Sequence, residues 1–204
     1  MADAPPDSAE LPAWRAFVFK HRGTLLALPA LALTTFGKPS APAVAVGLPV
    51  AFLGEALRCW AVGYSGDTSR GDTVTAPALV TAGPYAYVRN PLYVGNFLTA
   101  LGFSIAYTGG LDARARAALI ALGLGTMTAV YATIVPLEEA YLRRTFGAEF
   151  EAYVEAVPRT WPRFSPAGPQ RGEYDAGVIA RAETRTFATF GAMLATLALK
   201  AARG

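Results

Sequence analysis

The chain has 204 residues, of which 53% are hydrophobic and only 16% are charged. Soluble domains carry about 25% charged residues, so too few are present here to cover the surface of a soluble globular protein. The net charge of +3 is small and no basic stripe with interleaved aromatic residues is present, which excludes a typical nucleic-acid-binding protein. A single cysteine, Cys59, and a single histidine, His21, exclude an internal disulfide and a Cys- or His-rich metal site. We therefore expect one integral membrane domain over residues 1–204, with no nucleic acid or metal as a partner.

Five apolar stretches predict helices that cross a membrane or lie along it. The residues before them are polar and rich in proline, unlike a signal peptide, so we expect the first stretch to remain in the protein. The first four approach the roughly 20 apolar residues that a spanning helix needs. The fifth is shorter, and is either a span or an interfacial or re-entrant helix. The stretches are residues 23–37 (extended back to 17), 41–64, 91–107, 117–137 and 187–199.

The distribution of basic residues predicts the orientation. If the N-terminus is cytoplasmic and all five stretches cross, most lysines and arginines fall on the cytoplasmic side, as the positive-inside rule requires. Two large segments, residues 65–90 and 138–186, then face the cytoplasm. We expect an integral protein of a bacterial inner membrane, with its active site on the cytoplasmic side.

The first cytoplasmic segment ends in a motif, residues 79–95, that reads LVTAGPYAYVRNPLYVG. Gly-Pro and Asn-Pro are turn signals, and Pro91 suits the first position of the third span. A tight loop that carries three tyrosines, one arginine and one asparagine is an unusual entry to a membrane helix. The alternative is an aromatic belt with an asparagine cap, because tyrosine collects at membrane interfaces.

The second cytoplasmic segment, residues 138–159, reads EEAYLRRTFGAEFEAYVEAVPR and leaves the fourth span directly. Its apolar residues lie at helical spacing, which predicts an amphipathic helix on the membrane. Glu138 and Glu139 stand at the inner end of the span. A carboxylate pair is usually a solvated helix face, but a charge at this depth is costly and requires a partner.

Together these two segments resemble the isoprenylcysteine carboxyl methyltransferase family, to which phospholipid methyltransferases are related. The family pattern is Leu-Val-Thr-x-Gly-x-Tyr leading to Arg-His-Pro-x-Tyr-x-Gly, then a Glu-Glu helix that ends in Val-Pro. The resemblance implies a methyltransferase with S-adenosyl-L-methionine as cofactor and a core over residues 77–164. It also implies an all-α fold, a polytopic membrane helix bundle of about five transmembrane helices, in which a cytoplasmic amphipathic helix closes the cofactor site.

Site residues can be carried over by position. Adenine needs an apolar or aromatic wall, the methionyl ammonium and the ribose need a carboxylate such as Glu138, and a sulfonium suits a tyrosine face. An amine acceptor would need a base, for which Glu139 is the nearest candidate. Arg159 and Arg89 are possible anion contacts, although Arg159 also suits membrane phosphates. The resemblance assigns to the cofactor Pro77, Ala78, Leu79, Val80, Tyr85, Asn90, Pro91, Leu92, Tyr93 and Glu138.

Two departures from the family pattern concern the acceptor. Asn90 replaces the usual histidine and cannot change charge. Ile134 stands where prenylcysteine-processing members carry an arginine, so prenylcysteine itself is not expected. The acceptor is lipid-like or small, and isoprenylcysteine-like O-methylation, phospholipid N-methylation and thiol S-methylation stay open. The alternatives outside methyl transfer are a sterol-reductase-like oxidoreductase and a non-enzymatic membrane protein.

The second span carries two charged residues, Glu55 and Arg58, three positions apart on one helix face. They form either a polar contact to the head group of a lipid-like substrate or a mutual ion pair. The pattern slightly favours the ion pair. We expect His21 at the interface and Cys59 in packing, and the sequence leaves the oligomeric state open.

Overall fold

The computed structural model describes residues 12–66 and 78–203 of the chain. Within these ranges the protein forms seven α-helices and one short 3-10 helix, and no strand, which confirms the all-α prediction. The elements are α1 (Ala13–Phe36), α2 (Ala41–Ser65), η2 (Gly83–Ala86), α3 (Pro91–Thr108), α4 (Ala113–Phe146), α5 (Ala148–Ala156), α6 (Ala176–Ala182) and α7 (Thr184–Arg203).

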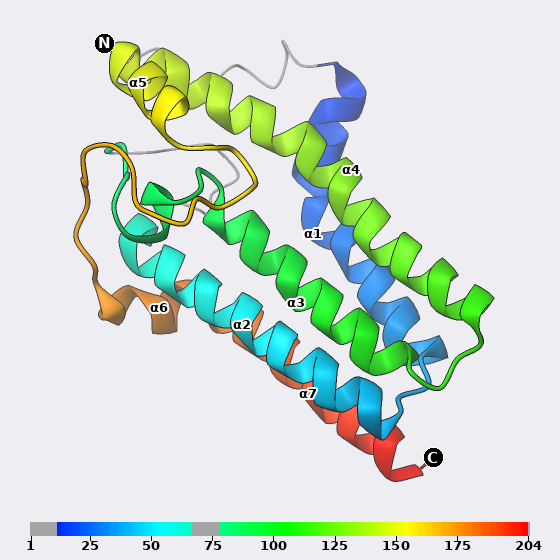
Figure 1. Ribbon diagram of the computed structural model, residues 1–204. Coiled ribbons are helices and arrows are strands. Elements are labelled where there is room, and N and C mark those ends of the chain that lie inside the picture. The colour runs from blue at the N-terminus through cyan, green and yellow to red at the C-terminus, as the bar shows by residue number, and fades with distance from the viewer. Residues whose placement is uncertain (1–11, 67–77, 204) are drawn as a thin grey trace.

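The long helices form a bundle with α3 inside it (Figure 1). α3 packs against α1, α2, α4 and α7, while α1 packs mainly on α4. η2, α5, α6 and the loops that join them gather toward the end of the bundle where α1 begins. The α1–α2 turn lies at the opposite end beside the C-terminal turn of α7, because Lys200 Nζ donates to the carbonyls of Thr35 and Gly37 at 3.1 and 3.0 Å. The two sequence motifs, residues 79–95 and 138–159, therefore meet at the end of the bundle where α1 begins.

Three helices of the described chain, α1, α2 and α4, are long and apolar enough to cross a membrane, as expected for an integral membrane protein. The predicted stretches at 91–107 and 187–199 also form helices, α3 and α7, but neither meets that standard of length and composition. α3 is enclosed by other helices and carries polar residues such as Asn96 and Ser104. α7 buries only one face, through Phe190, Met193 and Leu197.

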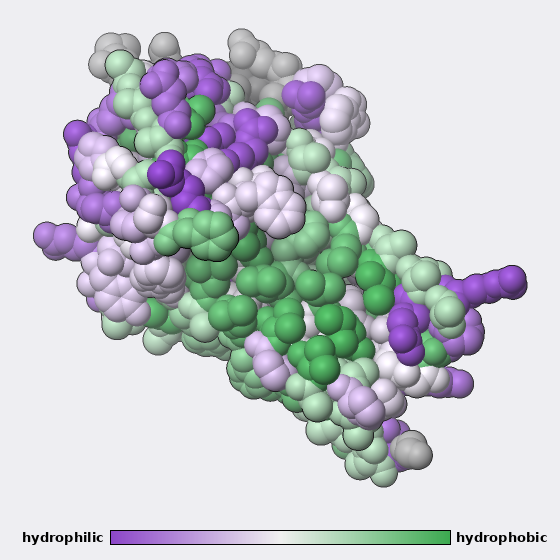
Figure 2. Space-filling model, in the orientation of Figure 1, coloured by the Kyte–Doolittle hydropathy of each residue, from purple (hydrophilic) through white to green (hydrophobic). Residues whose placement is uncertain are grey.

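The surface of the bundle matches a membrane setting. Figure 2 shows hydrophobic side chains over the middle of the bundle and hydrophilic side chains gathered at the end that carries α5. Large apolar side chains stand exposed on the long helices, where a soluble protein would not gather them. They include Leu28, Leu31, Phe36, Val46, Phe52, Leu53 and Leu122.

The helix that follows the fourth span differs from the predicted one. We expected the segment 138–159 to form an amphipathic helix separate from the fourth span, but α4 continues without interruption to Phe146, and Pro136 lies inside it. With 34 residues, α4 is about 51 Å long, so it extends well beyond a hydrocarbon core of about 30 Å. Gly147, at φ 50°, then turns the chain into the separate helix α5. Glu138 and Glu139 thus lie on a rigid extension of the span.

Glycines bring α2 and α3 into close contact. Gly47, Ala51 and Gly54 of α2 are buried against Gly95 and Gly102 of α3. A Cβ on Gly54 would lie 2.5 Å from the backbone nitrogen of Thr99 and 2.6 Å from the carbonyl oxygen of Gly95. Small residues at such spacing let helix backbones approach closely in a membrane.

Identical substitutions at two helical glycines are expected to change stability in opposite directions. Gly54→Ala forces the two backbones apart and should lower the free energy of unfolding by about 1–3 kcal/mol. Gly125→Ala should raise it by about 0.5–1 kcal/mol through helix propensity, because a Cβ there meets nothing within 4 Å. The midpoint of thermal unfolding in detergent measures both. Equal shifts for the two variants would show that α2 and α3 do not pack through Gly54.

Candidate functional site

Main-chain hydrogen bonds join the two sequence motifs. The segment after α5 lies against the segment that leads into α3. Arg89 N donates to Pro158 O at 2.9 Å, and Arg163 N donates to Tyr87 O at 3.0 Å. Ala167 N and Tyr153 Oη add bonds to the carbonyls of Ala86 and Tyr85 at 3.0 and 2.8 Å. This double segment closes one end of the bundle.

The buried side chain of Arg89 stabilises this closed end of the bundle. It is 9% exposed, and its guanidinium contacts Glu139 Oε1 at 3.1 Å and donates to the carbonyls of Val154 and Val157. A buried guanidinium needs this many acceptors, because each donor that stays unpaired costs free energy. Arg89, considered above as an anion contact, is therefore committed to protein groups.

Glu139 receives a second guanidinium, from Arg159. The Arg159 side chain is half-exposed and hydrogen-bonds to both oxygens of the Glu139 carboxylate. The hydrogen bond that Arg159 donates to the Glu139 carboxylate raises the pKa of Arg159 above its ordinary value. Glu139 thus connects the segment that follows α5, through Arg159, with the segment that precedes α3, through Arg89. Arg159 is not among the residues that line the cavity described next.

A cavity of about 990 Å³ lies beneath the joined motifs and extends down the bundle between α1, α3, α4 and α7. Most of the predicted site residues line it, and these are Ala78, Leu79, Val80, Tyr85, Asn90, Pro91, Leu92, Tyr93, Glu138 and Glu139. Pro77 lies outside the described residues. Ile134 also lines the cavity and is buried, so the wall is apolar at the position where the resemblance implies an arginine in prenylcysteine-processing members.

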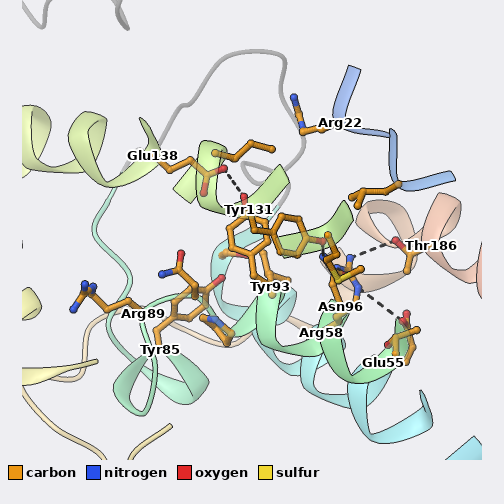
Figure 3. A pocket seen from close by; sticks show the side chains of 18 of the residues that line it. Arg22, Glu55, Arg58, Tyr85, Arg89, Tyr93, Asn96, Tyr131, Glu138 and Thr186 are labelled. Carbon is orange, nitrogen blue, oxygen red and sulfur yellow. Dashed lines mark hydrogen bonds and ion pairs between the residues drawn. The ribbon is translucent and has the colours of Figure 1, made fainter. Parts of the chain in front are cut away.

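Two tyrosines of the first motif are fixed in the upper part of the cavity. Tyr93 Oη donates to Glu138 Oε1 at 2.7 Å, which joins α3 to α4 across the cavity (Figure 3). Burial raises the pKa of Tyr85 to about 12, so its hydroxyl stays protonated. The upper cavity therefore presents a carboxylate and aromatic faces side by side. Asn90 turns its amide toward the Arg159 carbonyl, to which Nδ2 donates at 3.1 Å.

A buried polar cluster lies deeper, where the sequence indicated only the pair Glu55 and Arg58. The Arg58 Nε to Glu55 Oε2 distance is 3.8 Å, which confirms an ion pair. The nearer carboxylate belongs to Glu183, whose oxygens lie 2.8 and 2.9 Å from Arg58 Nη2. Arg58 also donates to Asn96 Oδ1. Asn96 Nδ2 in turn donates to Tyr131 Oη at 2.7 Å.

Other residues that line the cavity were not predicted from the sequence. Tyr131 of α4 packs its ring on Tyr93, with ring centroids 4.3 Å apart. Phe19, Arg22 and Leu26 of α1 also line the cavity. Polar residues at helical spacing in apolar helices were the available signal for Asn96 and Tyr131. Glu183 gave none, because its partner is 125 positions away.

The lowest part of the cavity is apolar, with Leu33, Phe103 and Met193 on its walls. Gly123 is buried there, and a Cβ on it would meet only Ser104 Oγ, at 3.7 Å. Among residues 12–66 and 78–203, no group of three His, Cys, Asp or Glu side chains stands close enough to hold a metal ion. The cavity thus changes from polar at the closed end to apolar within the bundle.

The chain is similar to three curated proteins over part of its length. The chain is 38% identical over 87 residues to the nickel-cobalt-cadmium resistance protein NccN of Alcaligenes xylosoxydans xylosoxydans, covering 43% of this chain and 37% of that protein. It is 39% identical over 84 residues to the protein-S-isoprenylcysteine O-methyltransferase of Schizosaccharomyces pombe, covering 41% of this chain and 33% of that protein. The cobalt-zinc-cadmium resistance protein CzcN of Cupriavidus metallidurans is 39% identical over 87 residues, which is 43% of this chain and 37% of that protein.

The matches span only about a third of the length of these curated relatives. No solved structure matches the chain. Residues 42–149, which run from α2 to the start of α5, match the family described as phospholipid methyltransferase. This range contains the first motif, the Glu138–Glu139 pair and three of the helices that enclose the cavity. The chain belongs to the phospholipid methyltransferase family, which includes isoprenylcysteine methyltransferases.

Proposed function

We propose that this protein is a membrane-embedded, S-adenosylmethionine-dependent methyltransferase that acts on a lipid-like or small acceptor. One observation carries the proposal. Residues from both motifs, distant in sequence, line one cavity at the closed end of the bundle, with Tyr93 and Glu138 hydrogen-bonded inside it. Family membership supports the same reaction. By the distribution of basic residues, this end faces the cytoplasm of a bacterial inner membrane.

The chemistry of the cavity fits the cofactor. A cavity of about 990 Å³ lies at the upper end of the range for small-molecule sites, about 300–1,000 Å³, which leaves room for an acceptor. Glu138 suits the methionyl ammonium or the ribose hydroxyls, and Leu79 and Val80 offer an apolar wall to adenine. A sulfonium against the face of Tyr93 or Tyr85 gains about 0.5–2 kcal/mol.

The bound cofactor would supply an electrophilic methyl group, and an acceptor lone pair forms the new bond to carbon as the carbon–sulfur bond breaks and leaves its electron pair on sulfur. The protein then has to orient the acceptor and exclude water. The joined motifs provide the exclusion, because Arg89 and Glu139 hold them closed. Glu139, the nearest base for an amine acceptor, binds two guanidiniums. We therefore favour an acceptor that is already anionic, a carboxylate or a thiolate, which needs no base.

Thermal unfolding with ligand tests the proposal. At a concentration 100 times its dissociation constant, S-adenosylhomocysteine should stabilise the detergent-solubilised protein by about 2.7 kcal/mol, whereas NADPH should not. No shift with S-adenosylhomocysteine in a protein that unfolds cooperatively would refute the proposal. A shift with NADPH alone would favour the oxidoreductase alternative. Mass spectrometry of membrane lipids labelled from deuterated S-adenosylmethionine would then identify the acceptor.

The lower cavity supplies a separate expectation. Gly123→Leu should place its side chain in open space and block the part of the cavity farthest from Glu138. Methyl label in membrane lipids should fall at least tenfold, while stabilisation by S-adenosylhomocysteine persists. Gly125→Leu is the matched control, because Gly125 is exposed on the same helix and should leave both measurements unchanged. Unchanged labelling in Gly123→Leu would mean that the acceptor does not reach the lower cavity.

A further inference from the structure

The hydrogen bonds around Arg58 fix the direction of every donor up to Tyr131. Guanidinium groups only donate, so the Asn96 atom that faces Arg58 must be its oxygen. The Asn96 amide nitrogen then faces Tyr131 and donates to the tyrosine oxygen at 2.7 Å. Tyr131 Oη is therefore an acceptor on this side. Figure 3 shows the sequence of groups from Arg58 through Asn96 to the tyrosines.

Because Tyr131 accepts a hydrogen bond from Asn96, its own hydroxyl proton must point away from Asn96. Tyr131 is 8% exposed, and it lines the cavity. Within the described parts of the chain, its hydroxyl oxygen accepts from Asn96 and its own proton forms no hydrogen bond to a protein group. A buried hydroxyl proton without an acceptor costs free energy. A bound molecule that offers a lone pair at this position removes that cost.

The neighbouring tyrosine has the opposite arrangement. Tyr93 lies against Tyr131, with ring centroids 4.3 Å apart, but its hydroxyl proton is used by Glu138 at 2.7 Å. The two phenols thus serve different partners although they lie side by side. The Tyr93–Glu138 pair faces the joined motifs, whereas Tyr131 connects to the cluster of Arg58, Glu183 and Glu55 deeper in the bundle.

We infer that Tyr131 binds the methyl acceptor by donating a hydrogen bond to its anionic oxygen or sulfur. The inference rests on the proposed function and narrows its substrate class to carboxylates and thiolates. An ammonium group presents only donors and cannot satisfy the Tyr131 proton. Asn96 is a positioning residue. Its amide nitrogen donates to Tyr131 and so orients the tyrosine hydroxyl, but it does not itself bind the methyl acceptor. Arg58, held by Glu183, in turn sets the direction of Asn96.

The experiment uses hexanoate and hexylamine as probes of equal chain length and opposite head-group chemistry. Both are added to the detergent-solubilised full chain at saturating S-adenosylhomocysteine, and thermal unfolding is followed. Hexanoate should stabilise the protein further and hexylamine should not. Tyr131→Phe should weaken hexanoate binding by about tenfold or more, the usual effect of losing a hydrogen bond to a charged group. Its response to S-adenosylhomocysteine should persist, which also reports that the variant is folded.

Two further variants separate the interpretations. Tyr93→Phe keeps the ring stack and should weaken S-adenosylhomocysteine binding while sparing hexanoate, the reverse of Tyr131→Phe. Asn96→Asp offers Tyr131 an acceptor in place of a donor, which turns the hydroxyl proton away from the cavity, so hexanoate binding should fall although the hydroxyl remains. Hexylamine binding as tight as hexanoate, or unchanged hexanoate binding in Tyr131→Phe, would overturn the inference. Loss of the S-adenosylhomocysteine response in the unmodified protein, with hexanoate still bound through Tyr131, would overturn the proposed function alone.

Discussion

Glu138→Gln is expected to abolish stabilisation by S-adenosylhomocysteine. The carboxylate lines the upper cavity and accepts the hydroxyl proton of Tyr93. Glutamine keeps the size and an acceptor oxygen but removes the charge that an ammonium group requires. The stabilisation of about 2.7 kcal/mol expected at 100 times the dissociation constant should fall to near zero at the same ligand concentration.

Glu155→Gln is the matched control for this result, because Glu155 is exposed on α5 and does not line the cavity. Its response to S-adenosylhomocysteine should equal that of the unmodified protein. Tyr93→Ala should resemble Glu138→Gln, since it removes both the aromatic face and the hydrogen bond that positions the carboxylate. Full stabilisation in both variants would show that the cofactor lies elsewhere in the cavity, even if the family reaction is correct.

Glu183→Ala is expected to produce the largest loss of stability. Glu183 is 0% exposed, and both of its oxygens lie within 3 Å of Arg58 Nη2. Removing one partner of a buried ion pair leaves an uncompensated charge and typically costs about 3–5 kcal/mol. The thermal unfolding midpoint in detergent should fall by several degrees.

The double variant Arg58→Met with Glu183→Leu tests the cause. Apolar residues of similar volume often replace a buried ion pair at little cost, so the double variant should recover part of the lost stability. An unfolding midpoint for Glu183→Ala equal to that of the unmodified protein would instead mean that Glu55 alone compensates Arg58. The same measurement shows whether α6 and α7, which join at Glu183, depend on this contact to stay docked on α2.

The sequence predicted the parts of the fold that depend on local composition. Long apolar stretches with few charges give α1, α2 and α4, since such a stretch has few alternatives to a spanning helix. α3 and α7 also lie at the predicted positions, but Asn96 of α3 bonds to Arg58 and Tyr131 on neighbouring helices and α7 buries only one face. Composition alone does not describe that setting. The amphipathic segment after the fourth span was divided incorrectly, because Glu138 to Phe146 continue α4 in line.

The candidate site was predictable where its residues are close in sequence. Leu79 to Tyr93 form one motif, so they arrive at the cavity together. The roles of Arg89 and Arg159 were not predictable, since these residues bind Glu139 from 50 and 20 positions away in the sequence. A charged residue's pairing over such distances depends on how helices pack, which no local pattern records. Glu183 was missed for the same reason, whereas Tyr131 carried a local signal, a polar residue in an apolar helix, that the prediction did not use.

The closure of the cavity by main-chain hydrogen bonds has a consequence for how this protein can diverge. Between residues 158 and 171, the groups that bind the first motif are backbone amides and carbonyls, which every residue except proline provides in full. Except at Arg159, whose side chain binds Glu139, substitutions there should be well tolerated, and the aromatic side chains at Trp161 and Phe164 are exposed. A one-residue insertion, by contrast, would shift Arg163 and Ala167 out of register with Tyr87 and Ala86. In this segment the number of residues, more than their identity, should decide whether the cavity stays sealed.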